Sequence, residues 1–228
     1  MKEINLLEKY PNPNSARKIS SKNERTIKNK IIASYRDKEY FDGDRNNGYG
    51  GFNYDERWLK VLPDIFEYYK LRNTSKILQI GSEKGFLLSD ILKINSTMLV
   101  HGIETSNYAI ENTIKDVKNY IKKVDHYYDL PFPENSFDLI IVIGAIYTLN
   151  IYDTIRCLLE IKRIGKGASF ITLATYDTAE ELDLFRRWSL LGTTILLKEE
   201  WLEILQHVDY KGEYYFVSAK SLKLEKND

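Results

Sequence analysis

Blocks of apolar and polar residues alternate along residues 74–219 and predict strands and helices in turn. The strands are predicted where short apolar runs of strand length occur: 76–80, 97–103, 121–124, 137–143, 168–174 and 213–219. Helices are predicted between them, where apolar residues recur every three or four positions: 86–92, 108–120, 154–164, 180–190 and 199–208. This alternation predicts an α/β fold with a doubly wound, mostly parallel sheet and helices on both faces.

The N-terminal quarter has a different pattern. Residues 1–30 are polar and lysine-rich, and residues 22–35 allow one helix with a sparse apolar face. Residues 40–58 have no apolar period and hold four of the twelve glycines, which predicts a loop. Helical period returns over 57–71, where Pro63 predicts a kink or a break. We expect residues 1–58 to form an extension and cover loop, and residues 59–228 to form the α/β domain.

The ends of the first two strands predict the position of a ligand, because ligands of open α/β sheets lie beyond the carboxyl ends of the strands. Gly81 and Gly85 follow the first strand and permit a tight turn into a helix. Glu104 ends the second strand, where a carboxylate can accept hydrogen bonds from both ribose hydroxyls of a nucleoside. The sequence therefore predicts a nucleotide-type ligand at this edge.

A third motif narrows the family. Residues 129–140 read Asp-Leu-Pro-Phe-Pro-Glu-Asn-Ser-Phe-Asp-Leu-Ile and lead into an apolar strand. This segment resembles the LPF-P-D/E-N-S-F-D-L/V motif of Rossmann-fold methyltransferases that depend on S-adenosylmethionine (SAM), in particular those that act on small molecules. Residues 78–86 resemble the first glycine motif of that family, and residues 102–106 resemble its G-x-D/E-x-S motif. The three motifs occur in the family's order and cover roughly residues 74–175.

The resemblance implies SAM as cofactor, S-adenosylhomocysteine as product, and a SAM-binding methyltransferase domain over residues 59–228. It implies backbone contacts to SAM from the first turn, a ribose contact from Glu104, an adenine contact from Asp125 or His126, and a floor under SAM after the fourth strand. The implied cofactor-binding residues are Gln79, Ile80, Gly81, Ser82, Gly85, Glu104, Thr105, Asp125, His126, Gly144 and Ala145. The chain departs from the family at Gln79, where an acidic residue is usual, and at Glu83, where the middle glycine is usual.

Residues of the cover loop favour an anionic methyl acceptor, because arginine and glycine suit the recognition of anions. The expected substrate-binding residues are Arg45, Tyr49, Tyr54, Arg57 and Arg186, and Tyr147 is the candidate catalytic residue. The cover loop and residues 186–194 also resemble extensions in a bacterial subset of the family, some of which modify surface polysaccharides, sugars or phosphates. The predicted reaction is methyl transfer to oxygen, or nitrogen, of a small phosphate-, phosphoramidate- or sugar-nucleotide-bearing metabolite.

Composition limits the other partners. Lys and Arg number 33, equal to Asp and Glu, so no overall charge attracts nucleic acid or an anionic membrane. Cys157 is the only cysteine, which excludes an internal disulfide and a cysteine-built metal site, and no metal is expected. No apolar run approaches the ~20 residues of a membrane span. We expect a soluble cytoplasmic protein with a small-molecule acceptor, for which a homodimer is compatible.

Two alternatives stay open at this point. A nicotinamide-dependent (NAD) oxidoreductase shares the strand, glycine turn, helix and acidic residue, but a fuller G-x-G-x-x-G turn is typical of that class. A catalytically weak or inactive partner protein with a methyltransferase fold is suggested by Gln79 and Glu83. Binding of SAM, S-adenosylhomocysteine or NAD separates these interpretations.

Overall fold

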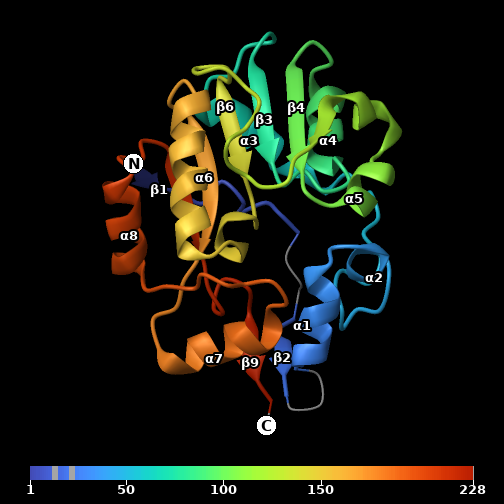
Figure 1. Ribbon diagram of the computed structural model, residues 1–228, viewed down its shortest axis with the longest axis vertical. Helices are drawn as coiled ribbons and strands as arrows, with labels where there is room; N and C mark the ends of the chain where they lie inside the picture. Colours follow the sequence, from blue (N-terminus) through green and yellow to red (C-terminus); the bar gives the residue numbers. More distant parts are fainter. Residues whose placement is uncertain (12–14, 21–23, 228) are drawn as a thin grey trace.

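A seven-stranded sheet organises the computed structural model, which describes residues 1–11, 15–20 and 24–227 (Figure 1). The strand order is β1-β8-β7-β6-β3-β4-β5, and every pairing in this sheet is parallel. The strands are β1 (Lys2–Glu3), β3 (Lys76–Ile80), β4 (Leu99–Glu104), β5 (Ile121–Lys123), β6 (Leu139–Val142), β7 (Ser169–Ala174) and β8 (Glu213–Val217). The prediction of a doubly wound α/β fold is therefore confirmed.

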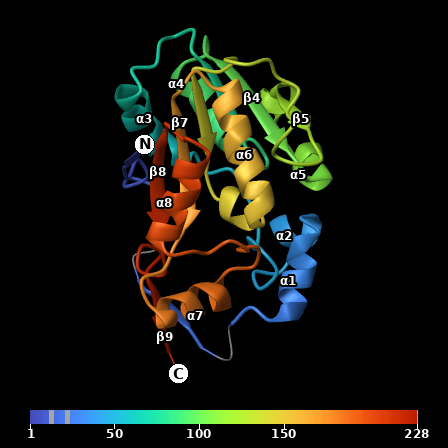
Figure 2. The same ribbon diagram turned by 60° about the vertical axis from the view of Figure 1, so that its left-hand side comes forward.

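Helices cover both faces of the sheet, as successive side chains of each strand point to opposite faces. One face carries α6 (Ile151–Ile164) and α8 (Lys198–His207), where Leu158 and Trp201 are fully buried. The other face carries α3 (Leu62–Tyr68) and α4 (Phe86–Ile94), where Ile65 and Leu88 are fully buried. Figure 2 shows α6 and α8 side by side on the first face.

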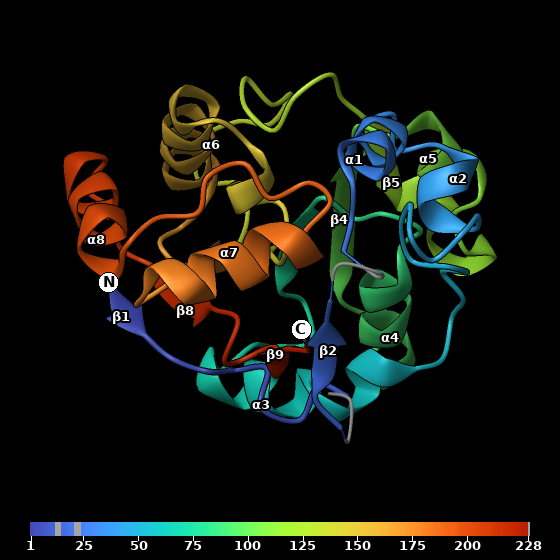
Figure 3. The same ribbon diagram turned by 90° about the horizontal axis from the view of Figure 1, so that it is seen from below.

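A smaller layer lies below the carboxyl ends of the strands in Figure 1 and is nearest the viewer in Figure 3, which is seen from below. It contains α1 (Ile27–Ser34), α2 (Lys38–Phe41), α7 (Ala179–Trp188) and a two-stranded parallel sheet of β2 (Arg17–Ile19) with β9 (Leu224–Lys226). Segments 17–19 and 224–226, far apart in the sequence, pair in this sheet. Ile19 and Leu224 pack with Leu184 of α7 in a separate small apolar cluster. We call this lower layer the cover layer.

Several predicted elements have different bounds in the structure. The helix predicted over 108–120 divides into α5 (Asn107–Glu111) and the 3₁₀ helix η2 (Lys115–Tyr120), and the backbone N–H of Ile114 between them donates to Lys84. Pro63 marks the predicted break, between the 3₁₀ helix η1 (Arg57–Lys60) and α3. A further 3₁₀ helix, η3 (Ile146–Thr148), follows β6. The predicted start of the first helix at residue 22 lies outside the described residues.

The division into residues 1–58 and 59–228 stays a prediction, although the layers do not follow it. Strand β1 belongs to the main sheet, and α7 and β9 belong to the cover layer. Within the described residues, no helix is long and apolar enough to cross a membrane.

Candidate functional site

A cavity of about 370 Å³ separates the carboxyl edge of the sheet from the cover layer. On the sheet side it is lined by Gly81, Gly144, Ala145 and Tyr147. A second cavity of about 180 Å³ lies beside the first and is lined by Gln79, Ser82, Phe86 and Trp58 among others. The two cavities share lining residues, and both are lined by Glu83. Both cavities therefore lie beyond the carboxyl ends of β3 and β6, where open α/β sheets bind their ligands.

The glycine turn after β3 has a conformation that its glycines permit. Gly81 and Gly85 have φ values of +74° and +81°, in the left-handed region. A Cβ atom on Gly85 would lie 2.7 Å from Cγ2 of Val117, so the turn also requires close packing against η2. Glu83 has a φ of +51° in the same turn. This conformation directs the backbone of the turn toward the cavity while η2 packs behind it.

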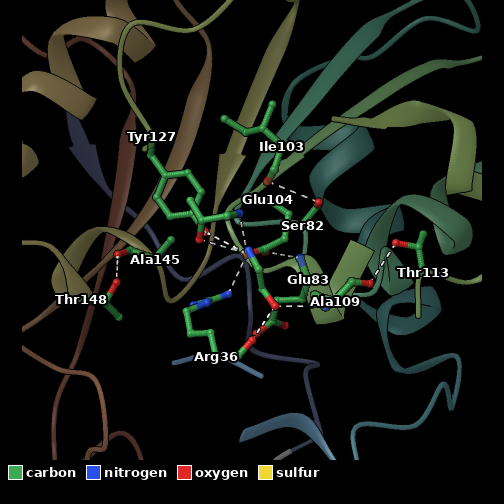
Figure 4. A network of polar contacts seen from close by, with 12 residues as sticks. Arg36, Ser82, Glu83, Ile103, Glu104, Ala109, Thr113, Tyr127, Ala145 and Thr148 are labelled. Carbon is green, nitrogen blue, oxygen red and sulfur yellow. Dashed lines mark hydrogen bonds and ion pairs between the residues drawn. The ribbon is translucent and has the colours of Figure 1, made fainter. Parts of the chain in front are cut away.

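Glu104 is fully buried at the end of β4 and is the centre of a polar network (Figure 4). Its Oε1 accepts hydrogen bonds from the backbone N–H groups of Thr105 and Ser106 and from the Arg36 guanidinium at 3.1 Å. Its Oε2 accepts only from the Glu83 N–H, at 2.8 Å, among the described residues. Each carboxylate oxygen has about two lone-pair sites, so Oε2 can accept one further hydrogen bond.

Arg36 reaches this network from the cover layer. It lines the larger cavity and forms an ion pair with Glu104, and its Nε has no hydrogen-bond partner among the described residues. The neighbouring charges of Glu104 and of the Tyr127 hydroxyl outweigh burial and hold the pKa of Arg36 well above its usual value. Arg36 was not predicted as a site residue, because the ion pair joins segments 68 positions apart.

Gln79 is buried on β3 and its Oε1 has no hydrogen-bond partner among the described residues. Leaving a buried polar atom unpaired costs about 1–3 kcal/mol, so such an atom at a cavity wall indicates a missing donor. Gln79 lines the smaller cavity, next to the glycine turn. An ammonium group, such as that of the methionine part of SAM, is a donor that fits this position.

These observations favour a fit to SAM at this edge of the sheet. Gly144 has a positive φ and leaves the wall open, since a Cβ there would meet only the Tyr147 hydroxyl, at 3.8 Å. A Cβ on Gly81 would lie 3.0 Å from Cβ of Ala145, so this position requires glycine for close packing. Gln79 offers an unpaired acceptor and Glu104 offers one free acceptor site. Tyr127 lines the larger cavity, with its hydroxyl 3.4 Å from Oε1 of Glu104. The cofactor-binding role of these residues remains a prediction.

The other predicted cofactor residues, Glu104 among them, do not line either of the two cavities. Ile80 and Gly85 are buried in packing, and Thr105 hydrogen-bonds to Glu104. Asp125 and His126 are exposed, and the His126 ring stacks on Tyr128 with a centroid distance of 4.3 Å. Tyr127, the residue that follows His126, lines the larger cavity instead. The sequence placed the adenine contact in this loop, but an irregular loop has no period that would identify the inward-facing residue.

Hydrogen bonds attach the cover loop to the glycine turn and the helix after it. The Tyr49 hydroxyl donates to Oε1 of Glu83 at 2.5 Å, and the Tyr54 hydroxyl donates to Asp90 of α4. Lys84 forms a buried ion pair with Asp42 at 2.7 Å. Of the two predicted tyrosines, Tyr49 lines both cavities and Tyr54 lines neither. The hydrogen bond of Tyr54 to Asp90 attaches the loop to α4.

Arginines line the cover side of the larger cavity. Arg45 and Arg57, both predicted, are among them, and Arg186 is exposed and is not a lining residue. The segment predicted around Arg186 does contribute Trp188 and residues 189–192. The structure adds three arginines that the sequence did not identify: Arg17, Arg25 and Arg36. Glu83 is the only acidic lining residue of this cavity among the described residues.

Among the lining groups with shifted pKa values, Glu83 and Tyr147 bear on proton transfer. Burial raises the pKa of the Glu83 carboxyl to about 7, although Arg36 and the hydrogen bond from Tyr49 oppose the shift. Burial also raises the pKa of the Tyr147 hydroxyl above its usual value. Glu83 can therefore exchange a proton near neutral pH, whereas Tyr147 stays protonated and acts as a hydrogen-bond donor. No group of His, Cys, Asp and Glu residues that could hold a metal ion is present in the described part of the chain.

The fold is that of a Rossmann-type α/β protein, and its two cavities lie at the carboxyl edge of the sheet. In a comparison with known families, residues 78–172 match the model of a methyltransferase domain. A search of curated proteins found no match.

Solved structures with the same fold include the [4+2]-cyclase SpnF, with a TM-score of 0.55 and 16% identity over 86% of this chain and 74% of that one. YcgJ of Bacillus subtilis has a TM-score of 0.51 and 17% identity over 64% of this chain and 66% of that one. The complex of the Haloferax volcanii Trm112 methyltransferase activator with a methyltransferase has a TM-score of 0.51 and 17% identity over 79% of this chain and 75% of that one. At these identities the likeness shows the fold alone.

Proposed function

We propose that the protein transfers the methyl group of SAM to an oxygen, or nitrogen, of a small anionic molecule. The observation that carries this proposal is the cavity itself, with the glycine turn on one side and five arginines on the other. The buried Glu104 carboxylate lies behind the turn, where it accepts a hydrogen bond from the Glu83 N–H. The family match supports the methyl transfer, and the arginines support the anionic acceptor.

The methyl donor would lie against the sheet. Gly81 and Gly144 would face it with backbone, Gln79 would accept from its ammonium group, and Glu104 would accept from a ribose hydroxyl. SAM supplies a methyl group that its sulfonium has already activated. The remaining work of the protein is to align the acceptor, exclude water and remove a proton.

Glu83 is the residue best placed to remove that proton. It lines both cavities, Tyr49 holds its Oε1, and no described residue hydrogen-bonds to its Oε2. A base with a pKa near the operating pH is the most effective one. Glu83 would take the proton of an acceptor hydroxyl as the new O–CH₃ bond forms, and the protonated Tyr147 would donate a hydrogen bond to the acceptor.

The acceptor would enter beneath the cover layer. Phosphate-, phosphoramidate- and sugar-nucleotide-bearing metabolites all carry the anionic groups that arginines bind. A role in modifying surface-polysaccharide precursors fits this chemistry, and such precursors would place the enzyme in the cytoplasm.

Calorimetric titration with SAM, S-adenosylhomocysteine and NAD is the first test, followed by a methyl-transfer screen of phosphorylated acceptors. We expect saturable binding of SAM and S-adenosylhomocysteine, and methyl transfer to an anionic acceptor. Tight NAD binding without SAM binding would contradict the proposal. Binding of none of the three ligands would favour an inactive partner protein.

A non-methylating enzyme is the second candidate function. The similarity to a structure described as a [4+2]-cyclase motivates it, since the same fold there has another activity. This candidate predicts SAM binding without release of S-adenosylhomocysteine in the presence of any acceptor.

A further inference from the structure

The five arginines of the larger cavity differ in their charge partners. Arg36 is paired with Glu104 at 3.1 Å, and Arg57 is paired with Asp55 at 2.7 Å. Arg17, Arg25 and Arg45 line the cavity and form no ion pair with a described residue. Three guanidinium groups of one cavity therefore have no ion-pair partner in the described part of the chain.

The three unpaired arginines come from separate parts of the cover layer and lie close together. Arg17 is in β2, Arg25 precedes α1 and Arg45 lies in the cover loop. The guanidinium carbons of Arg17 and Arg25 lie 5.5 and 5.6 Å from the ring centroid of Trp188. Arg25 also donates to the Arg45 carbonyl, at 3.5 Å. The β2–β9 pairing and α7 thus bring all three arginines to one wall of the cavity.

The positions of these side chains are fixed by contacts that leave their charges uncompensated. Arg25 donates to the carbonyl of Trp188 at 2.8 Å, and Arg45 donates to the carbonyl of Gly48. These carbonyls use only part of the five N–H donors of each guanidinium. The remaining donors are held in place at the wall, which is the arrangement that binds phosphate groups in bidentate fashion.

The charges of the three arginines repel one another. Burial lowers the pKa of Arg25 to about 10, and the charges of Arg45 and Arg17 add to this effect. Burial and the charge of Arg45 likewise lower the pKa of Arg17. Like charges gathered in a partly buried wall destabilise the folded chain, and a ligand that supplies the opposite charge would remove this repulsion.

We infer that Arg17, Arg25 and Arg45, together with Trp188, form a subsite for a diphosphate group carried by the methyl acceptor. Three uncompensated positive charges match the two to three negative charges of a diphosphate ester better than the charge of a monophosphate or a single carboxylate. That the diphosphate belongs to a methyl acceptor rests on the proposed function. The anion site itself is inferred from the arginines alone. Such a group occurs in nucleoside diphosphates and in other diphosphate esters.

The test is calorimetric titration of the full chain with inorganic pyrophosphate, orthophosphate and uridine diphosphate at fixed ionic strength. We expect pyrophosphate to bind at least tenfold more tightly than orthophosphate. Tighter binding of uridine diphosphate than of pyrophosphate would identify a nucleoside diphosphate as the source, and equal binding would identify the diphosphate group alone. Absence of pyrophosphate binding, or equal affinity for orthophosphate, would overturn the inference.

Variants separate the subsite from general electrostatic attraction. Arg25→Gln and Arg17→Gln should each weaken pyrophosphate binding at least tenfold and leave S-adenosylhomocysteine binding unchanged. Arg72→Gln removes an exposed arginine before β3 that lines neither cavity, and it should leave pyrophosphate binding unchanged. Equal weakening by Arg72→Gln would contradict a localised subsite.

A thermal measurement covers the case in which a variant folds poorly. Without ligand, Arg17→Gln should unfold at the same temperature as the wild type or at a higher one, because it removes a repelling charge. With pyrophosphate, the wild type should gain more thermal stability than the variant. Lower stability of Arg17→Gln without ligand, together with an undiminished gain, would contradict the inference. Pyrophosphate binding without S-adenosylhomocysteine binding would contradict the proposed function and still support the diphosphate subsite.

Discussion

The two walls of the larger cavity are built in different ways. The sheet wall comes from strand ends and the turns that follow them. The unpaired amide oxygen of Gln79 lies beside it in the smaller cavity, and the buried Glu104 carboxylate lies behind its glycine turn. The cover wall comes from both ends of the chain and carries the arginines. The sheet wall therefore offers acceptors and the cover wall offers positively charged donors.

Because the two walls differ in this way, the site has separate positions for a cationic and an anionic ligand. The sheet wall suits the cationic, hydroxyl-rich SAM, and the cover wall suits an anion. Glu83 lies between the two walls. Its backbone belongs to the glycine turn, and its side chain accepts a hydrogen bond from Tyr49 of the cover loop. If this comparison holds, substitutions in one wall should change the binding of one ligand and leave the other unchanged.

The largest effect is expected at Glu83, where the two walls meet. Glu83→Gln removes the proposed base and should lower kcat about 10²- to 10⁴-fold. In the wild type, kcat/KM should rise with pH and level off above about 7, because the carboxyl, whose pKa is raised to about 7, must lose its proton to act as a base. Stopped assays between pH 5.5 and 9 measure both effects. A wild-type profile that is flat across pH 7 would exclude this role.

A substitution of Tyr49 tests the same pH dependence of kcat/KM. Its hydrogen bond stabilises the ionised Glu83, so Tyr49→Phe should move the rise in kcat/KM to higher pH. The matched control is Tyr152→Phe, since Tyr152 is exposed on α6. A fall in rate without any movement of the pH profile would indicate that Tyr49 acts only in packing.

Glu104 should give the next largest effect, confined to the sheet wall. Glu104→Gln leaves Arg36 without its charge partner, and breaking a buried ion pair in this way costs about 3–5 kcal/mol of unfolding free energy. It should also weaken S-adenosylhomocysteine binding roughly hundredfold, through lost charge-assisted hydrogen bonds. Urea denaturation and calorimetry provide the two readouts, with the exposed Glu203→Gln as control. Unchanged affinity in a folded variant would remove Glu104 from the cofactor site.

The cover wall should respond in affinity for the acceptor. Arg45→Ala should raise the KM for an anionic acceptor about tenfold, and Arg57→Ala should raise it less because Asp55 already neutralises that charge. Affinity for S-adenosylhomocysteine should not change in either variant. Initial-rate kinetics over a range of acceptor concentrations measure these effects. If neither substitution alters the KM, the acceptor does not bind through these arginines.

The smallest effect concerns Gln79. Gln79→Glu places a negative charge beside the proposed ammonium site and should tighten SAM binding several-fold. It should also lower the free energy of unfolding, because a buried carboxylate loses hydration. Calorimetry and thermal unfolding provide the two readouts. Weaker SAM binding by this variant would move the ammonium group away from Gln79.

The sheet wall could be predicted from the sequence because its signals are local. The bounds of β3 agree with the prediction, and the end of β4 places Glu104 beside the glycine turn. An apolar run that ends in glycine or an acidic residue predicts a strand end at a ligand site, and this prediction does not depend on distant segments of the chain. The roles of these residues remain predictions.

The cover wall could not be predicted in the same way. Arg17 and Arg25 lie in a polar segment without apolar period, and their position depends on the pairing of β2 with β9, some two hundred residues further along the chain. Short strands of two or three residues carry too little pattern to be recognised. The arginines of the cover loop were identified because glycines and aromatic residues marked that loop as unusual.

The central claim is that the two walls bind two different ligands at once. Titration with S-adenosylhomocysteine of the wild type, of Glu104→Gln and of Arg25→Gln, each with and without saturating pyrophosphate, tests it most directly. The account predicts binding by the wild type and by Arg25→Gln, greatly weakened binding by Glu104→Gln, and little effect of pyrophosphate. Competition between S-adenosylhomocysteine and pyrophosphate, or loss of S-adenosylhomocysteine binding in Arg25→Gln, would contradict it.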